Sequence, residues 1–213
     1  MSAVELLYGS RHFDDVVGAR DGAPTLIREK IEDIVLPDVE IHYCLFELPM
    51  ASALARLPTS LHPSIPAVLG ITIWKCASGP LGPFSLAYVG AACRTGIKPR
   101  HFIHGAFCDV SGIGRWFAKT YGLDCQPASI HSLETYDRIH SRITVEGAAV
   151  LDLATIGAQP LVGRGATVKY SPALNVARLD SQVTLIQMEA SFNFKRVVRG
   201  IPATHRYDAA ALG

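Results

Sequence analysis

The pattern of apolar and polar positions after Glu40 is typical of short β-strands separated by turns. Stretches rich in β-branched and aromatic residues, each long enough for one strand, alternate with segments rich in glycine and proline. The strand-like stretches are 40–48, 67–76, 84–94 and 100–110, and the breaks between them are 58–66, 77–83 and 94–99. Short connections join antiparallel neighbours, so the first half of the chain predicts an antiparallel meander.

The second half adds one helix and then returns to strands. The segment 112–120 is long enough for a short helix, and the apolar spacing within 24–36 predicts another near the N-terminus. Strand composition, rich in Val, Ile, Thr and Phe, follows at 141–155, 163–172, 180–194 and 196–200. The fold class is therefore mainly β (α+β) with a few short helices. So many strands most easily protect their edges by curling into a barrel or a double sheet.

Composition limits the chain to an ordered globular protein. It has 213 residues, of which 49% are apolar and 18% are charged, and this balance excludes intrinsic disorder. The length fits one domain over 1–213 with a peripheral N-terminal segment at 1–36, and 207–213 resembles a loose tail. The small residues Gly90, Ala91, Ala92 and Gly105 would leave an interior cavity if they faced inward.

Charge and the N-terminal sequence narrow the classes of partner. Twenty Lys and Arg residues against nineteen Asp and Glu give a net charge of +1, so nothing favours binding to nucleic acid or to an anionic membrane. The first residues lack the basic start of a signal peptide, and no apolar run approaches the roughly 18 residues of a membrane span. We therefore expect a cytoplasmic homo-oligomer whose partner is a small molecule.

The cysteines, histidines and glycines give no metal or cofactor motif. Five cysteines form no CxxC pair, and their odd number argues against a disulfide framework. His101 and His104 are three residues apart in a predicted strand, where an odd separation sends two side chains to opposite faces, so a shared metal is not expected. Glycine pairs at 112–114 and 163–165 lack the rest of a dinucleotide-binding fingerprint and are expected to be turns. We predict no cofactor.

Four segments between residues 50 and 130 together suggest a family. They are a short helix leading to prolines (50–64), a strand (68–75), a glycine-aromatic strand (81–94) and a strand ending in Cys-Asp (101–110). Their order resembles the acetoacetate decarboxylase-like superfamily, and residues 177–192 extend the resemblance more weakly as a closing hairpin. The resemblance implies a β-cone or double barrel with a buried cavity.

The chain departs from that family where its chemistry is expected. Family decarboxylases carry an aromatic-Pro-Lys-Lys motif after the helix that follows the Asp-ended strand, and its first lysine forms a Schiff base with the substrate. Counting from Asp109 without gaps, the motif falls on 123–126, so both lysines are missing and Cys125 lies among their positions. The family's glutamate falls on Leu86. The resemblance therefore implies a cavity without the imine-forming amine.

Alternation within the strands selects candidate catalytic residues. The strand phase of the missing glutamate contains Phe84, Leu86 and Tyr88, and one phase of the next strand contains Phe102, His104, Ala106 and Cys108. Tyr88 and His104 are thus the predicted proton donor and base, and Glu189, an acid within an apolar strand, is a third candidate. Each also has an ordinary structural interpretation as a hydrogen-bonded core residue or a solvated side chain. The predicted substrate-binding residues are Cys125, Leu86, Phe84, Trp116 and Arg94.

Three hypotheses for function remain open. The first is a lyase, dehydratase or cyclase/isomerase of secondary or catabolic metabolism that acts without a Schiff base on a small, largely apolar carbonyl or enol compound. The second is a catalytically silent member that binds a ligand or builds an oligomer. The third is a decarboxylase that uses Lys119, a lysine of the predicted helix.

Overall fold

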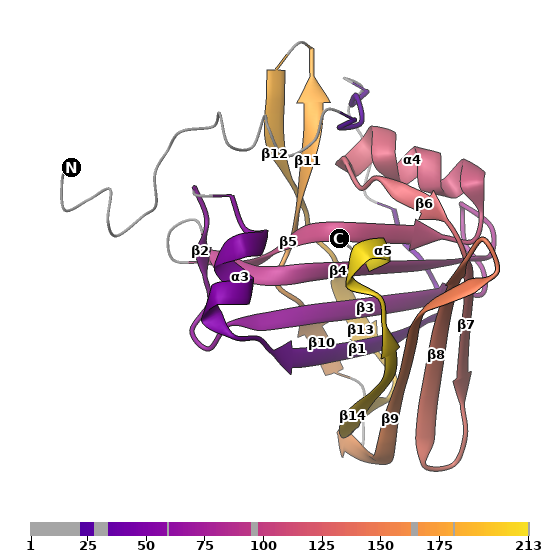
Figure 1. Cartoon of the computed structure of the whole chain (residues 1–213). Coiled ribbons are helices and arrows are strands. Elements are labelled where there is room, and N and C mark those ends of the chain that lie inside the picture. Colours follow the sequence, from indigo (N-terminus) through magenta and orange to yellow (C-terminus); the bar gives the residue numbers. More distant parts are fainter. Residues whose placement is uncertain are drawn as a thin grey trace.

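The fold is mainly β, as predicted. The structure is a computed structural model that describes residues 22–27, 34–58, 60–94, 98–162, 166–180 and 182–212. Within these ranges the chain forms three β-sheets and a few short helices (Figure 1).

The largest sheet, sheet A, contains the predicted antiparallel meander. Its eight strands include four that follow one another in space as they do in sequence, with two added at one edge. These six are β1 (Val39–Glu47), β3 (Val68–Cys76), β4 (Phe84–Arg94), β5 (Pro99–Cys108), β11 (Ala173–Leu179) and β12 (Gln182–Met188). The short strand β2 (His62–Pro63) pairs with β4, and β6 (Cys125–Pro127) pairs with β5 in parallel.

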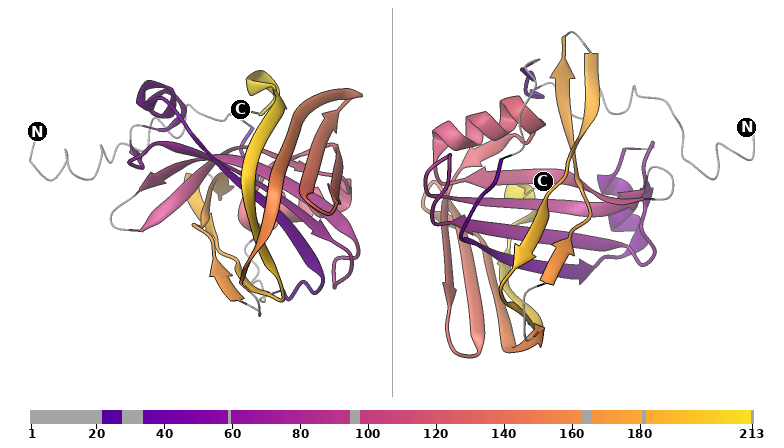
Figure 2. Two further views of the ribbon diagram at one scale, coloured as in Figure 1. Left: turned by 90° about the horizontal axis from the view of Figure 1, so that it is seen from below. Right: turned by 180° about the vertical axis from the view of Figure 1, so that it is seen from behind.

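Sheet B has four antiparallel strands and lies across one face of sheet A, which we call the inner face (Figures 1 and 2). Its strands are β7 (Ser129–Glu134), β8 (Arg138–Val145), β9 (Ala148–Val162) and β14 (Val197–Tyr207). Glu146 and Gly147 both have positive φ in the turn between β8 and β9. Two such residues match the right-handed twist of the flanking strands and fix the hairpin register.

The third sheet, sheet C, has two strands and crosses the outer face of sheet A. Strands β10 (Ala166–Lys169) and β13 (Ser191–Phe194) pair with each other, and the chain continues from them into the β11–β12 hairpin. The rear view in Figure 2 shows them passing over β1 and β3. One long hairpin therefore joins sheet A at one end and covers its outer face at the other.

Within the described residues, the sheets do not close into a barrel. The described strands form the double-sheet alternative, with an apolar core on each side of sheet A. The inner core lies between sheets A and B and includes Ile71, Val89, Phe107 and Leu153, all almost fully buried. Burying such side chains is the main stabilising contribution to the packing of the two sheets.

The described helices pack against sheet A. They are α3 (Met50–Arg56), α4 (Ser111–Tyr121) and α5 (Ala209–Leu212). Helix α4 confirms the helix predicted at 112–120; it buries Ile113 and Phe117 against the outer core and ends at Gly122, whose φ of 67° is left-handed. Such a glycine commonly ends a helix because it has no Cβ to clash there.

Four local predictions differ from the structure or lie at least partly outside the described residues. Residues 112–114 lie at the start of α4 instead of forming a turn, while 163–165 fall outside the described residues. In the segment 24–36, the first part is extended, and Thr25 forms a parallel β-bridge with Arg178 of β11. The Leu26 N–H donates to the Arg178 carbonyl, and the Arg178 N–H donates to the Pro24 carbonyl. The rest of that predicted helix, at 28–33, also lies outside the described residues. The expected loose tail contains the short helix α5.

Candidate functional site

A cross-strand row on the outer face of sheet A carries a cluster of polar side chains. Tyr43 of β1 is opposite Thr72 of β3, and Thr72 is opposite Tyr88 of β4. Tyr88 is opposite Ala106 of β5, which is opposite Cys125 of β6. Neighbouring strands are about 4.8 Å apart, so these five residues form a continuous line over five strands. We call it the cross-strand row; it places three hydroxyl groups beside one another.

A β-bulge in β5 decides which histidine faces this row. Val89 pairs with Gly105 and the next residue, Gly90, pairs with Ile103, so His104 is the extra residue between the two pairs. An extra residue reverses the alternation of side chains on either side of it. His101 and Ile103 therefore share the outer face with Tyr88, as Ala106 does.

His101 presents an imidazole nitrogen toward the middle of the outer face. A Cβ atom placed on Gly70 would lie 2.9 Å from His101 Nε2, so the ring lies directly over this glycine. Nε2 is buried and makes no hydrogen bond within the described part of the chain, while the other ring nitrogen donates to the Ser171 backbone. Burial lowers the pKa of His101, and the Ser171 bond opposes this shift in part. The imidazole is thus neutral at pH 7 and Nε2 carries a lone pair.

The phenols near His101 remain protonated at neutral pH. Burial raises the pKa of Tyr43 to about 12, and the neighbouring Tyr170 adds to the shift. Burial also raises the pKa of Tyr88, against a smaller opposing effect of its side-chain hydrogen bond with Thr72. The pKa of Tyr170 is raised by burial as well. Proton-transfer sites use environments that lower the pKa of a base and raise the pKa of nearby acids.

Sheet C covers this part of the face with aromatic rings. The Tyr170 ring lies 4.7 Å from the Tyr43 ring, and Phe192 lies 5.5 Å from both Tyr170 and Trp74 (centroid distances). Trp74 in turn lies 5.9 Å from Tyr88 in an edge-on contact. The hydroxyl groups are therefore surrounded by apolar rings, which strengthens any hydrogen bond that they make.

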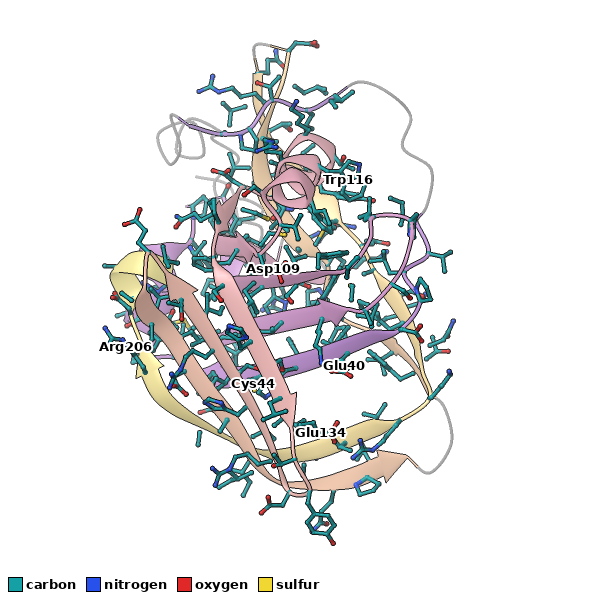
Figure 3. All side chains as sticks on the ribbon, turned by 90° about the vertical axis from the view of Figure 1, so that its right-hand side faces the viewer. Glu40, Cys44, Asp109, Trp116, Glu134 and Arg206 are labelled. Carbon is teal, nitrogen blue, oxygen red and sulfur yellow. The ribbon has the colours of Figure 1, made fainter. Side chains whose placement is uncertain are left out.

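The other end of the row is apolar and lies against α4. Phe84, Leu86 and Cys125, three of the predicted substrate-binding residues, belong to this outer core, and Trp116 packs on it through Phe117 at 5.0 Å. Figure 3 shows Trp116 on α4 above the strand ends. Burial raises the pKa of the Cys125 thiol, so it is an apolar wall and not a ready nucleophile. The structure thus brings four predicted binding residues together with Tyr88.

Three other predicted site residues lie elsewhere. The His104 ring contacts Phe102 at 5.3 Å, and Phe102 pairs with Ala91, on the opposite face from Tyr88. Glu189 is exposed between β12 and β13, where Gln187 donates a hydrogen bond to it. Arg94 is exposed at the end of β4. His101, Tyr43 and Thr72 were missed by the sequence analysis; the glycine at 105, inside a strand, was the available signal for a bulge.

The lysines of the described ranges do not enter the outer face. Lys75, Lys98, Lys119, Lys169 and Lys195 are all exposed. Lys119 lies in the last turn of α4, and Lys169 is on the sheet C face opposite to Val168. A Schiff-base lysine needs burial or a neighbouring cation to become a neutral amine at pH 7. The five lysines of the described ranges are solvent-exposed instead of buried.

A second polar cluster, between sheets A and B, resembles a nucleophile with its base. Cys44 Sγ lies 3.4 Å from His42 Nε2, and His42 also contacts the hydroxyls of Thr155 at 2.7 Å and Ser141 at 2.8 Å. Burial raises the pKa of Cys44, and burial together with His140 lowers the pKa of His42 to about 4. Both groups are therefore neutral at pH 7, and their contacts join sheet A to sheet B. Figure 3 places Cys44 where the two sheets cross.

Comparisons with known structures show the fold. The enduracididine biosynthesis enzyme MppR, complexed with the condensation product of pyruvate and imidazole 4-carboxaldehyde, superposes with a TM-score of 0.62 and 16% identity, over 80% of this chain and 75% of MppR. Acetoacetate decarboxylase from Legionella pneumophila gives 0.62 and 12%, over 95% and 86%. An acetoacetate decarboxylase-like enzyme from Sphingomonas wittichii gives 0.53 and 12%, over 79% and 77%. The chain has the acetoacetate decarboxylase-like fold, as its sequence predicted.

Two comparisons of the sequence with known proteins found no match. No protein-family profile matches the sequence. No curated protein matches it either.

Among the described residues, no three His, Cys, Asp or Glu side chains are grouped so that they could hold a metal ion. None of the described helices combines the length and apolar character needed to cross a membrane.

Proposed function

We propose that the chain is an enzyme that acts without a Schiff base on a small, largely apolar carbonyl or enol compound, by general acid–base chemistry on the outer face of sheet A. One observation carries the proposal: the neutral His101 Nε2 lies over Gly70, one row from Thr72, while all the described lysines are exposed. The reaction types that fit are those of a lyase, dehydratase or cyclase/isomerase.

The proposed step is enolisation. His101 Nε2 takes the proton from the carbon next to the carbonyl, and the electron pair of that C–H bond forms the enol double bond. The carbonyl π electrons move to oxygen, where the hydroxyl of Tyr88 or Thr72 supplies a hydrogen bond or a proton. Rows on one strand face are about 7 Å apart, a span that a ligand of a few carbon atoms can bridge. Such general base catalysis contributes about 10²–10⁴-fold.

The matched structures support a carbonyl ligand. MppR has been crystallised with pyruvate and with a condensation product of pyruvate, both small carbonyl compounds or their products. In this chain the apolar end of the row, Ala106 and Cys125, together with the adjacent Leu86 of the outer core, would contact the carbon skeleton. The hydroxyl half would contact the oxygen.

Hydrogen–deuterium exchange tests the proposal. The protein is incubated in D2O with small ketones such as cyclohexanone, and deuterium at the α-carbon is followed by mass spectrometry. The unmodified protein should accelerate exchange. His101→Gln should slow the catalysed exchange about 100-fold or more, and Tyr88→Phe should slow it by about 100-fold if the phenol stabilises developing negative charge.

Two further histidine variants serve as controls. His131→Gln changes an exposed histidine of β7, and His104→Ala changes the bulge residue, whose ring contacts Phe102. Both should keep the exchange rate of the unmodified protein. Equal losses in His101→Gln and His104→Ala would show that the base has been assigned to the wrong side chain, and no acceleration by any folded form would reject the enzyme.

A catalytically silent ligand-binding or oligomer-forming protein is the second candidate. The observation in its favour is that the protein's own side chains fill the space over the glycines: a Cβ on Gly90 would lie 2.8 Å from Ile103 Cδ1. This candidate predicts that the protein does not accelerate deuterium exchange at the α-carbon of ketones, whether or not they bind.

A further inference from the structure

We infer that the site on the outer face of sheet A takes an uncharged ligand, a ketone or enol without a carboxylate, instead of a keto acid. This inference rests on the proposed function, because it names the class of substrate for the same site. It is carried by the charges around the cross-strand row.

The groups that line the polar half of the site are all neutral. Tyr43, Thr72 and Tyr88 offer hydroxyls, and His101 offers a lone pair on a ring that is uncharged at pH 7. A carboxylate moved into such a place loses its hydration without gaining a cation, which is strongly unfavourable. Hydroxyl donors alone recover only part of that cost.

Sheet C turns its charges away from the site. Val168 pairs with Phe192, and the Phe192 ring packs on Trp74. Because side chains alternate along a strand, Lys169 and its partner Ser191 point to the opposite side, where Lys169 is exposed. The cover over the ligand is therefore apolar, and its nearby cation is solvated.

The charged residues whose side chains alternate onto the outer face lie at the ends of their strands. Glu47 lies four residues from Tyr43 on β1, which is about 13 Å at the usual rise of a strand. Arg94 lies six residues from Tyr88 on β4, about 20 Å away by the same measure, and it is exposed. Among the described strand residues of sheet A that share this alternation, Arg94 is the one arginine or lysine, and the test therefore includes its variant.

Two probes of equal size separate the two ligand classes. Pentane-2,4-dione and acetoacetate have the same number of heavy atoms and the same spacing of carbonyl groups, and they differ in a methyl group against a carboxylate oxygen. Trp74 reports binding, because it contacts both Phe192 and Tyr88. Trp116→Phe removes the only other tryptophan of the chain and leaves Trp74 as the single emitter.

In the Trp116→Phe protein at pH 7.5 and constant ionic strength, the dione should quench Trp74 emission saturably, and acetoacetate should bind at least tenfold more weakly. Methyl acetoacetate, which is neutral, should bind like the dione. Adding Arg94→Gln should leave this ratio unchanged. Acetoacetate binding as tight as the dione, or a failure of both neutral probes to bind, would overturn the inference.

The exchange experiment separates this inference from the proposed function. Exchange in cyclohexanone together with tight acetoacetate binding would keep the enzyme and remove the uncharged-ligand inference. Selective binding of the neutral probes with no exchange would keep the ligand class and remove the catalytic role. Loss of acetoacetate binding on Arg94→Gln would place a carboxylate at the margin of the sheet and so contradict the inference directly.

Discussion

At the scale of single residues, the proposed enolisation depends on His101 staying neutral. Its ring is buried over Gly70 and one nitrogen is held by the Ser171 backbone, so the remaining nitrogen is a base whose orientation is fixed. A base of this kind needs no counter-charge, because the protein keeps it unprotonated by desolvation alone.

The pH dependence of exchange follows from this environment. An ordinary histidine has a pKa near 6.5, and burial lowers that of His101. The active, unprotonated form therefore persists below pH 6.5, and the rate should be level from pH 6.5 to 9, since the raised pKa of Tyr88 keeps its proton at the alkaline end. Initial exchange rates across this range, corrected for the uncatalysed reaction, measure the profile. An acid-side midpoint above 6.5 would contradict the assignment of His101.

Lysine chemistry gives a second prediction at this scale. Lys119 is exposed in the last turn of α4 and does not belong to the outer core. Borohydride added with acetoacetate should leave the intact mass unchanged, because no iminium forms to be reduced. A covalent mass increase that disappears in Lys119→Arg would instead support the decarboxylase hypothesis.

At the scale of elements, α4 approaches the sheet through a glycine. A Cβ atom on Gly114 would lie 3.2 Å from Cys125 Cβ and 3.3 Å from Cys108 Cβ, whereas nothing lies within 4 Å of one on Gly112. Both neighbours are fixed to strands of sheet A. The helix therefore sets the position of the apolar end of the cross-strand row.

The two glycines of α4 provide a matched pair of variants. Gly112→Ala should raise the free energy of unfolding by up to about 1 kcal/mol, because alanine is the better helix former. Gly114→Ala should be less stable than Gly112→Ala by about 1–3 kcal/mol, the usual cost of overpacking. Urea denaturation measures both. Equal stability of the two would mean that α4 is free to move away from β5 and β6.

Element prediction from sequence succeeded where alternation was regular and failed at the bulge. Strand β4 was predicted with its observed bounds, and Phe84, Leu86 and Tyr88 do share one face with Cys125. The assignment of His104 assumed regular alternation through β5. The bulge adds one residue, so each side chain of β5 before it lies on the face opposite to the one that regular alternation predicts. Bulge placement depends on pairing with β4, which the pattern of a single strand does not contain.

At the scale of the whole molecule, the two sheets are joined by a buried polar cluster as well as by apolar packing. His42 contacts hydroxyls of Ser141 and Thr155, both on sheet B, from its place on sheet A. A neutral imidazole can accept at one nitrogen and donate at the other, and rotating hydroxyls satisfy either tautomer. Protonation would remove the acceptor and bury a charge between the sheets.

Acid should therefore separate the sheets before it affects most other contacts. The pKa of His42 is about 4 in the folded chain and 6.5 in an ordinary histidine, so the unfolded chain takes up a proton first as pH falls. The stabilisation is complete above pH 6.5 and is lost progressively down to pH 4. The free energy of unfolding should fall by about 2 kcal/mol between pH 7 and pH 5, at about 1.4 kcal/mol per pH unit below 6.5.

Urea denaturation at several pH values measures this slope. His42→Gln should be less stable at pH 7 and show a flatter pH dependence, while His131→Gln, at an exposed position, should keep the slope of the unmodified protein. A slope that is the same in His42→Gln would assign the acid sensitivity to other groups.

The extra residue of β5 also affects how this chain is aligned with others. A relative whose strand lacks an insertion at position 104 would follow the same path and pair with the same neighbours, one codon shorter. Alignment methods place gaps in loops by preference, so they would shift every position before the bulge by one. They would then match His104 to the counterpart of Ile103 and Phe102 to the counterpart of His101. Superposition of coordinates avoids that error, and it is the basis on which functional residues should be transferred to or from this protein.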